Sequence, residues 1–275
     1  MDDFINNTRE WTVPWGITDD PWRSNEFFQY TQSQLPRFWE KLGGKPDFSG
    51  KKVLEVGCGL GNLCIDIAKC DAQEIIGIDI DQKSVEFASG NLAKKHKALT
   101  GKIKFLCCDI HDLPIDNFDI IISKDTFEHI LDLEGVLFDI RERMNLQGRI
   151  HTAFGPLYYS PFGDHNWTET FLPWGHILIP EEKIVKRLNK KHNSQITSIR
   201  ELGDGLNQLT PEEFSRILRL TNLRIVDYKE NVIPQDASFK KKIATKIMGQ
   251  LKHINQLSKY LTFNISCILE KNQAG

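Results

Sequence analysis

The chain has 275 residues, and its 35 basic and 37 acidic side chains give a formal net charge of -2, so no global field attracts nucleic acid. A chain of this length can bury a full core, and we expect one large domain with elaborations. Its first residues, MDDFINNTRE, are acidic and polar, unlike a signal peptide, and no stretch has the roughly 18 apolar residues of a membrane span. We therefore expect a cytoplasmic protein.

Short apolar runs alternate with amphipathic stretches from residue 51 onward. Strands are predicted at 51–57, 74–80, 103–110, 118–123 and 148–154, and helices at 62–70 and 84–96, the second with Asp81 or Ser84 as its N-cap. This alternation is typical of βαβ units and a parallel sheet. Thr210, Pro211 and Glu213 form a helix start of the capping-box type. Strands at 223–230 and 261–271 are expected to complete the sheet.

Three segments fall outside this pattern. Residues 1–46 form an N-terminal aromatic cap segment, and residues 155–208 form an insert within a domain that spans 47–275. These two segments contain all six tryptophans, and we expect them to form a lid: Trp11, Trp15, Trp22, Trp39, Trp167 and Trp174. Residues 236–260 are predicted to form a basic amphipathic helix, which either covers the sheet or rests on an anionic membrane surface.

A glycine-rich turn, VLEVGCGLGN, joins the first strand to the first helix. Glycine allows a tight turn there and a close approach of the backbone to a ligand. The dinucleotide fingerprint requires a further glycine where this chain has Asn62. Glu55 precedes the turn and suits a cationic amino-acid ligand. The pattern therefore favours S-adenosylmethionine (SAM) over NAD.

Carboxylates follow the next strands. Asp79 ends the second strand, where it can accept hydrogen bonds from ribose hydroxyls, and Asp109 ends the third, where it can accept from an adenine amino group. Lys124 and Asp125 lie at the carboxyl end of the fourth strand, where open α/β sheets bind ligands. Glu128 and His129, which follow them, either cap a helix or line the site.

The segments VLEVGCGLGN, GIDIDQKSVEFA and CCDIHDLPIDNFDIIISKDTFEHI, with GRIHTAF after them, resemble the class I SAM-dependent methyltransferases of the type 11 group. The resemblance implies a Rossmann-like α/β fold with a seven-stranded sheet in the order 3-2-1-4-5-7-6, the last strand antiparallel. It implies SAM as cofactor, S-adenosylhomocysteine as product, and these cofactor-binding residues: Glu55, Gly57, Cys58, Gly59, Gly61, Asp79, Ile80, Asp109, Ile110 and Lys124.

The acceptor is expected to lie under the aromatic insert. We predict these substrate-binding residues: Asp125, Phe154, Tyr158, Tyr159, Trp167 and Trp174. His165, in a polar turn after Asp164, is the predicted general base, with His129 and His176 as rivals. Asp164, His165 and His176 show no recognisable zinc spacing, and the six cysteines form no C-x-x-C pair, so no metal site is predicted.

Part of the insert also resembles methyltransferases of bacterial cell-surface glycans, which favours O-methylation of a sugar, a glycan precursor or a natural-product hydroxyl. Two alternatives stay open: an N- or C-methyltransferase of a lipophilic or amine metabolite, and a non-catalytic SAM-binding regulatory subunit. The expected partner is a small-molecule acceptor. The sequence does not determine the acceptor, the pathway or the oligomeric state.

Overall fold

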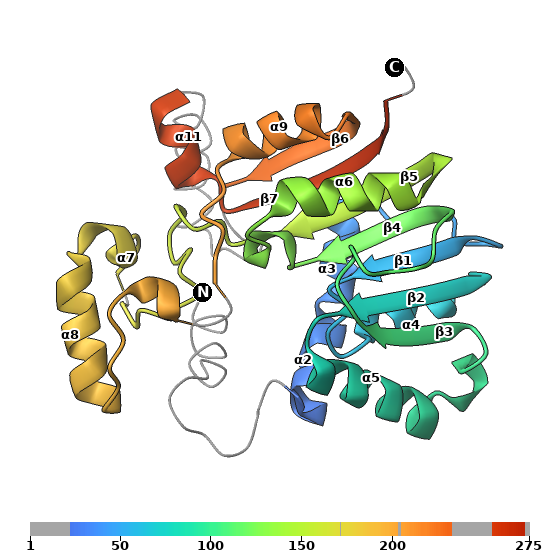
Figure 1. Ribbon diagram of the computed structural model, residues 1–275, viewed down its shortest axis with the longest axis horizontal. Coiled ribbons are helices and arrows are strands. Elements are labelled where there is room, and N and C mark those ends of the chain that lie inside the picture. Colours follow the sequence, from blue (N-terminus) through green and yellow to red (C-terminus); the bar gives the residue numbers. More distant parts are fainter. Residues whose placement is uncertain (1–22, 171, 203–204, 233–254, 273–275) are drawn as a thin grey trace.

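A mixed seven-stranded sheet organises the computed structural model, which describes residues 23–170, 172–202, 205–232 and 255–272 (Figure 1). The strand order is β3-β2-β1-β4-β5-β7-β6, as the resemblance implies. The strands are β1 (Lys52–Val56), β2 (Glu74–Asp79), β3 (Ile103–Cys107), β4 (Phe118–Lys124), β5 (Met144–Phe154), β6 (Leu223–Asn231) and β7 (Asn264–Lys271). β1 to β5 pair in parallel, whereas β7 is antiparallel to both of its neighbours.

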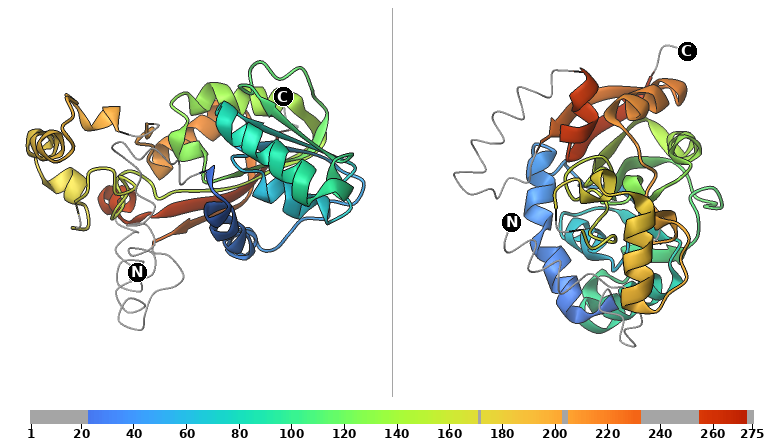
Figure 2. Two further views of the ribbon diagram at one scale, coloured as in Figure 1. Left: turned by 90° about the horizontal axis from the view of Figure 1, so that it is seen from below. Right: turned by 90° about the vertical axis from the view of Figure 1, so that its left-hand side faces the viewer.

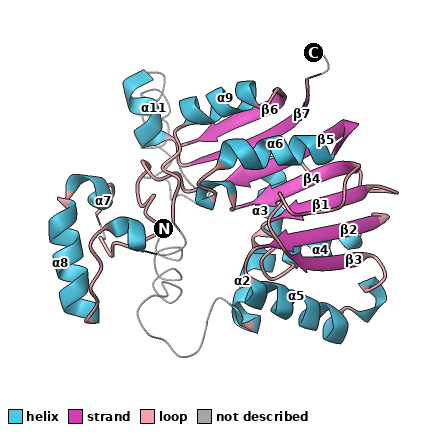
Figure 3. Cartoon of the chain, viewed as in Figure 1, coloured by secondary structure: helices cyan, strands magenta, loops and turns pink. Residues whose placement is uncertain are grey.

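Helices cover both faces of the sheet, as the cartoon in Figure 3 shows. One face packs on α6 (Leu133–Arg143) and α9 (Pro211–Leu220), and the other on α2 (Asn25–Ser33), α3 (Leu35–Lys41), α4 (Asn62–Ala68) and α5 (Gln82–Lys95). The central strands are buried on both sides, which explains why β2 and β4 are apolar along most of their length.

Two predicted helix starts are confirmed. The carboxylate of Asp81 accepts a hydrogen bond from the Ser84 N–H, so Asp81 is the N-cap of α5. Thr210 and Glu213 form a reciprocal capping box at the start of α9. Side-chain caps of this kind typically stabilise a helix by about 1 kcal/mol.

The segment after β5 forms a separate small unit beyond the carboxyl ends of the strands. It contains α7 (Gly175–Leu178) and α8 (Glu181–His192), which stand away from the sheet in Figures 1 and 2. Ile184, Leu188 and Leu202 form its own hydrophobic cluster, against which Trp167 packs. The short helix α11 (Asn255–Leu261) precedes β7.

Two aromatic side chains predicted on the substrate side lie in the core instead. The Trp39 ring packs against Phe48, and its Nε1 donates to Asp66 Oδ2 of α4 at 2.8 Å. Phe154 is 1% exposed, because its ring is packed between Phe127 and Phe214. Both are therefore packing residues of the sheet, whereas the sequence predicted Trp39 in a lid and Phe154 beside the acceptor.

Some predicted features lie outside the described residues, namely Trp11, Trp15, Trp22 and most of the predicted basic helix at 236–260. Within the described part of the chain, no helix is long and apolar enough to cross a membrane.

The glycine turn is tied to the loop after β4 by close packing. Gly57 adopts a left-handed φ of +74°, and a Cβ added there would lie 2.3 Å from Thr126 Oγ1. Gly61, the N-cap of α4, has a φ of +81°, and an added Cβ would lie 2.5 Å from the Phe105 ring. Gly59 has open space around it. The lack of a side chain therefore makes room for Thr126 at Gly57 and for Phe105 at Gly61. At Gly59 no neighbouring side chain requires it.

We expect Gly57→Ala to destabilise the fold more than Gly59→Ala. Both residues have positive φ, at which an L-residue costs about 1–2 kcal/mol, but only the Gly57 variant must also displace Thr126. The midpoints of urea unfolding measure the difference. Equal midpoints for the two variants would show that the packing of Thr126 against Gly57 carries no energetic weight.

Candidate active site

The glycine turn begins at the carboxyl end of β1 and is held by backbone hydrogen bonds. The N–H groups of Gly57 and Cys58 both donate to the Ile78 carbonyl at 2.9 Å, which ties the turn to β2. Gly61 N–H donates to Cys58 O at 2.9 Å and closes the turn at the start of α4. Ligands of open α/β sheets bind outside the carboxyl ends of the strands.

Glu55 lies beneath this turn as a buried carboxyl group. Its side chain is 3% exposed, and Oε2 has no hydrogen-bond partner. Burial, which disfavours the charged form, raises the pKa of Glu55 to about 8, against the opposing effects of Cys64 and Lys124. A cationic ligand would favour the ionised carboxylate.

Asp79 holds the turn and the start of α5 at the same time. Its Oδ2 accepts from Gly59 N–H at 2.7 Å, and its Oδ1 accepts from Asp81 N–H at 2.9 Å. Arg23, from the N-terminal segment, forms an ion pair with Asp81 at 2.5 Å. The carboxylate of Asp79 is thus fixed at the strand end, as a residue that contacts a nucleoside must be.

An apolar surface adjoins Asp79 at the ends of β2 and β3. Ile80 is 77% exposed, whereas Ile110 is buried. Asp109 Oδ1 accepts from His111 N–H at 2.9 Å, which fixes the carboxylate of Asp109. The exposed side chain of Ile80 therefore forms an apolar surface beside the Asp79 carboxylate.

The loop after β4 brings charged groups to the other side of the turn. The Lys124 ammonium contacts the Asp125 carboxylate, and Asp125 has a left-handed φ of 50°. Glu128 follows in a 3-10 turn and is 2% exposed. Its Oε1 accepts from Gly155 N–H at 2.8 Å, and its Oε2 has no partner. Burial, followed by repulsion from Asp125, raises the pKa of Glu128 to about 8.

His129 and His165 meet beside Glu128. Their ring centroids lie 5.0 Å apart, and Trp167 lies 5.9 Å from the first ring and 5.6 Å from the second. Nδ1 of His129 donates to Gly205 O at 3.1 Å, and Nε2 of His165 donates to Pro156 O at 3.1 Å. Burial and the neighbouring His129 lower the pKa of His165 to about 4, so its imidazole is neutral at neutral pH.

His176 does not join this cluster, although the sequence grouped it with His165. Its side chain is fully buried, Nε2 donates to Tyr158 O at 2.7 Å, and Nδ1 lies 3.6 Å from Asp164 Oδ1. Asp164 also accepts from the backbone N–H of Thr168. This pair holds the insert together, and it separates His176 from the cluster of His129 and His165.

The other predicted acceptor residues line the start of the insert. Tyr158 and Tyr159 are half-buried, with ring centroids 5.3 Å apart, and Lys259 lies 4.9 Å from the Tyr159 ring centroid. Trp174 Nε1 donates to Tyr260 O at 3.0 Å. These contacts link the insert to α11.

The sequence reasoning missed the residues that position the cluster. Asn207 Nδ2 donates to the carbonyls of Phe127 and Ile130, at 2.6 and 2.9 Å, and clamps the turn that carries Glu128. Lys41 of α3 is partly buried, and desolvation lowers its pKa although Asp125 opposes the shift. No local pattern marks either residue, since each reaches the site from a distant segment.

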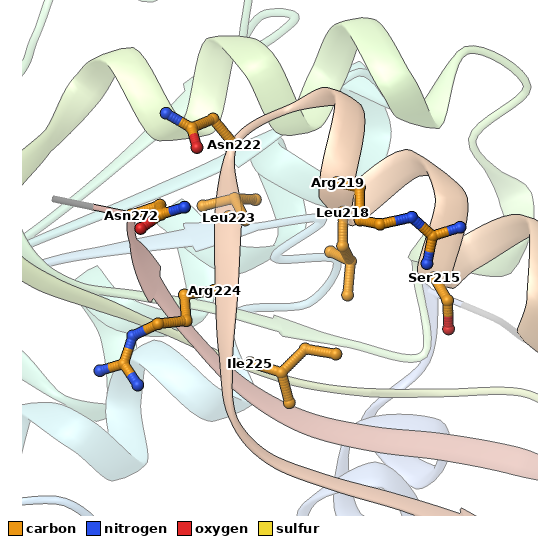
Figure 4. A pocket seen from close by; sticks show the side chains of 8 residues that line it. All are labelled: Ser215, Leu218, Arg219, Asn222, Leu223, Arg224, Ile225 and Asn272. Carbon is orange, nitrogen blue, oxygen red and sulfur yellow. The ribbon is translucent and has the colours of Figure 1, made fainter. Parts of the chain in front are cut away.

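A surface hollow of about 430 Å³ lies elsewhere, between α9, the start of β6 and the end of β7. Figure 4 shows Ser215, Arg219 and Arg224 around it. β6 is the edge strand, separated from β1 by β4, β5 and β7, and its start faces the amino ends of the parallel strands. This hollow therefore lies toward the amino ends of the parallel strands, whereas the cofactor is expected at their carboxyl ends.

Comparison with known proteins shows the family. Residues 47–195, more than half of the chain, match the model of a methyltransferase domain. The ubiquinone biosynthesis O-methyltransferase of Neisseria meningitidis serogroup A is 26% identical over 57% of this chain and 73% of its own length. That of Bartonella bacilliformis is 25% identical over 82% of each chain.

Solved structures show the same fold. A putative SAM-dependent methyltransferase from Listeria monocytogenes superposes with a TM-score of 0.57 at 17% identity, over 86% of this chain and 99% of its own. One from Mesorhizobium loti gives 0.54 at 14% identity, over 87% and 98%. The chain belongs to the methyltransferase-domain family and is a class I SAM-dependent methyltransferase.

Proposed function

We propose that the protein transfers the methyl group of SAM to a hydroxyl group of a small molecule, such as a sugar, a glycan precursor or a natural product. The observation that carries this proposal is the cluster of Glu128, His129 and His165, in which the neutral imidazole of His165 can accept a proton. Removing a proton helps an alcohol to react, whereas an amine needs less assistance. The ubiquinone biosynthesis O-methyltransferases among the relatives support the same type of acceptor.

The cofactor is assigned to the residues around the turn. Glu55 and the turn residues Gly57, Cys58, Gly59 and Gly61 would hold the methionine part, with Lys124 at its edge. Asp79 and Ile80 would contact the ribose, and Asp109 and Ile110 the adenine. The exposed face of Ile80 and the unpartnered Oε2 of Glu55 support this arrangement, because bound SAM would cover the first and satisfy the second.

The acceptor would lie between the loop after β4 and the insert at 155–208, with Asp125, Tyr158, Tyr159, Trp167 and Trp174 around it. Aromatic side chains give a large contact area at low entropic cost. The insert has its own small core, so it can close over the acceptor as one unit and exclude water.

In the transfer step the acceptor oxygen attacks the methyl carbon, an O–C bond forms, and the C–S bond breaks with its electron pair left on sulfur. The hydroxyl proton must leave the acceptor, and this step would depend on His165. The protein supplies mainly alignment of the two reactants and a dry site. The product of the cofactor is S-adenosylhomocysteine.

One experiment tests the proposed O-methylation together with its two alternatives. SAM labelled in its methyl group is incubated with panels of hydroxyl and amine acceptors, and methylated products and S-adenosylhomocysteine are quantified by mass spectrometry. We expect equimolar formation of S-adenosylhomocysteine and an O-methyl product. Transfer only to nitrogen or carbon would replace this proposal with the N- or C-methyltransferase alternative, and SAM binding without turnover would favour a regulatory subunit.

Binding of SAM is expected to release a proton through Glu55. Because its pKa is about 8, this carboxyl group is mostly protonated at pH 7, and a cationic ligand selects the carboxylate. Affinity should therefore rise between about pH 6 and about pH 8. Isothermal titration in buffers of different ionisation enthalpy measures the release. Glu55→Gln should abolish it and Glu128→Gln should retain it; a wild-type protein that releases no proton would remove Glu55 from the cofactor contact.

Substitution of His165 by alanine is expected to lower turnover by about 10²–10⁴-fold, because deprotonation of the acceptor affects the chemical step. SAM affinity, measured by titration calorimetry, should stay nearly unchanged. His111→Ala is the matched control, since its exposed ring pairs only with Asp139 among the described contacts. Near-normal turnover of His165→Ala would indicate an acceptor that needs no deprotonation.

A further inference from the structure

Glu128, His129 and His165 come from two separate segments and place three metal-ligand side chains together. Each offers one ligand atom, and these atoms all lie within 4.8 Å of one another. Ligand atoms of a tetrahedral zinc ion lie about 3.4 Å apart, given Zn–N and Zn–O distances of about 2.1 Å. Side-chain adjustments of up to about 1.5 Å would therefore bring all three atoms within binding distance of one ion.

We propose that Glu128, His129 and His165 bind one divalent first-row transition-metal ion, such as Zn²⁺, and that its open coordination positions take the acceptor oxygen. Two imidazoles and one carboxylate with open positions form the ligand set of catalytic zinc and non-haem iron(II) sites. Mg²⁺ and Ca²⁺ prefer oxygen ligands, so two histidines favour the transition metals. The sequence had predicted no metal.

The surroundings of the three side chains match those of metal ligands. Metal-binding histidines almost always donate their second ring N–H to a carbonyl or carboxylate, which orients the ring. Here His129 donates to Gly205 O and His165 donates to Pro156 O. These hydrogen bonds fix the orientation of both rings beside Glu128.

The environment of the Glu128 side chain is the strongest single observation in favour of a metal site. Its side chain is 2% exposed, Gly155 N–H fixes Oε1, and Oε2 is buried without a partner. A buried carboxyl oxygen without a partner is costly, and a bound cation would give it one. The nearby Lys124 ammonium contacts Asp125, and it donates no hydrogen bond to Oε2 of Glu128.

The segment after β5 positions two of the three ligands at once. Gly155 orients Glu128 through its N–H, and the next residue, Pro156, orients His165 through its carbonyl. Gly155 has a φ of +135°, and an added Cβ would lie 2.7 Å from Phe263 O, so only glycine fits. His165 itself has a left-handed φ of 53°. Strained backbone of this kind concentrates at functional sites.

The catalytic role of the ion rests on the proposed O-methylation, whereas the binding of the ion does not depend on that function. A hydroxyl group bound to the ion loses its proton more readily, and the proton passes to solvent. The oxygen then attacks the methyl carbon as the C–S bond breaks. With the ion bound, His165 serves as a ligand, and the dependence of turnover on His165 becomes a dependence on the ion.

The test measures metal binding without an acceptor. The untagged chain is stripped with a chelator and titrated with CoCl₂, and visible d–d absorption and metal analysis after dialysis report binding. We expect one ion per chain, and an affinity at least about tenfold lower in Glu128→Gln and His165→Ala, since even residues behind the ligands commonly change affinity by that factor. His111→Ala should bind like the wild type, and SAM titration verifies that each variant is folded.

Absence of the d–d bands, or unchanged affinity in both variants, would overturn the site. So would a thiolate charge-transfer band, which would place the ion on cysteine. A different result is expected if the metal site is right and the proposed O-methylation is wrong. In that case one ion binds at the three residues, and methyl transfer goes only to amines. O-methylation at full rate by the stripped enzyme would overturn the role of the ion in the reaction.

Discussion

The close approach of Thr126 to the backbone of Gly57 is the constraint on which the geometry of the site depends. β1 and β4 are neighbours in the sheet, and the loops that leave their carboxyl ends share one small space. Because Gly57 has no side chain, the loop after β4 can pack directly on the glycine turn. That contact places the cofactor-binding turn next to the segment that carries Glu128 and His129.

Burial then controls the chemistry of the charged groups in this space. Glu55 and Glu128 lie on opposite sides of the contact, and each is a buried carboxyl group with one unpartnered oxygen. In both cases desolvation is the largest cause of a pKa raised to about 8. Each carboxyl group would be satisfied by a positive charge. The cationic amino group of SAM would supply it at Glu55, and in our proposal a metal ion would supply it at Glu128.

The insert after β5 brings the remaining part of the site. His165 and Trp167 come from it and pack against His129 in the loop after β4, and His129 donates a hydrogen bond to Gly205 O of the same insert. The same insert uses Asp164 and His176 for its own internal packing. His165 and His176 thus make different contacts within one insert, and these contacts are set by what packs against each ring.

The sequence by itself determined the fold, and it predicted a cofactor site at the carboxyl ends of the strands. Alternating apolar runs and amphipathic stretches predicted β1 to β5, the glycine turn and the strand-end carboxylates Asp79 and Asp109, because these features depend on residues close together in the chain. The capping box at Thr210 was predicted for the same reason, and the strand order followed from the family resemblance.

Only the tertiary structure decided which side chains share the acceptor side. Trp39 was expected in a lid and Phe154 at the acceptor, but packing between layers buries both side chains. Glu128 could be read as a helix cap until Gly155 and His165 were placed beside it. The cluster of Glu128, His129 and His165 joins residues that the whole of β5 separates along the chain. No local sequence pattern predicts the distances between these residues or their burial. Long-range packing alone brings them together.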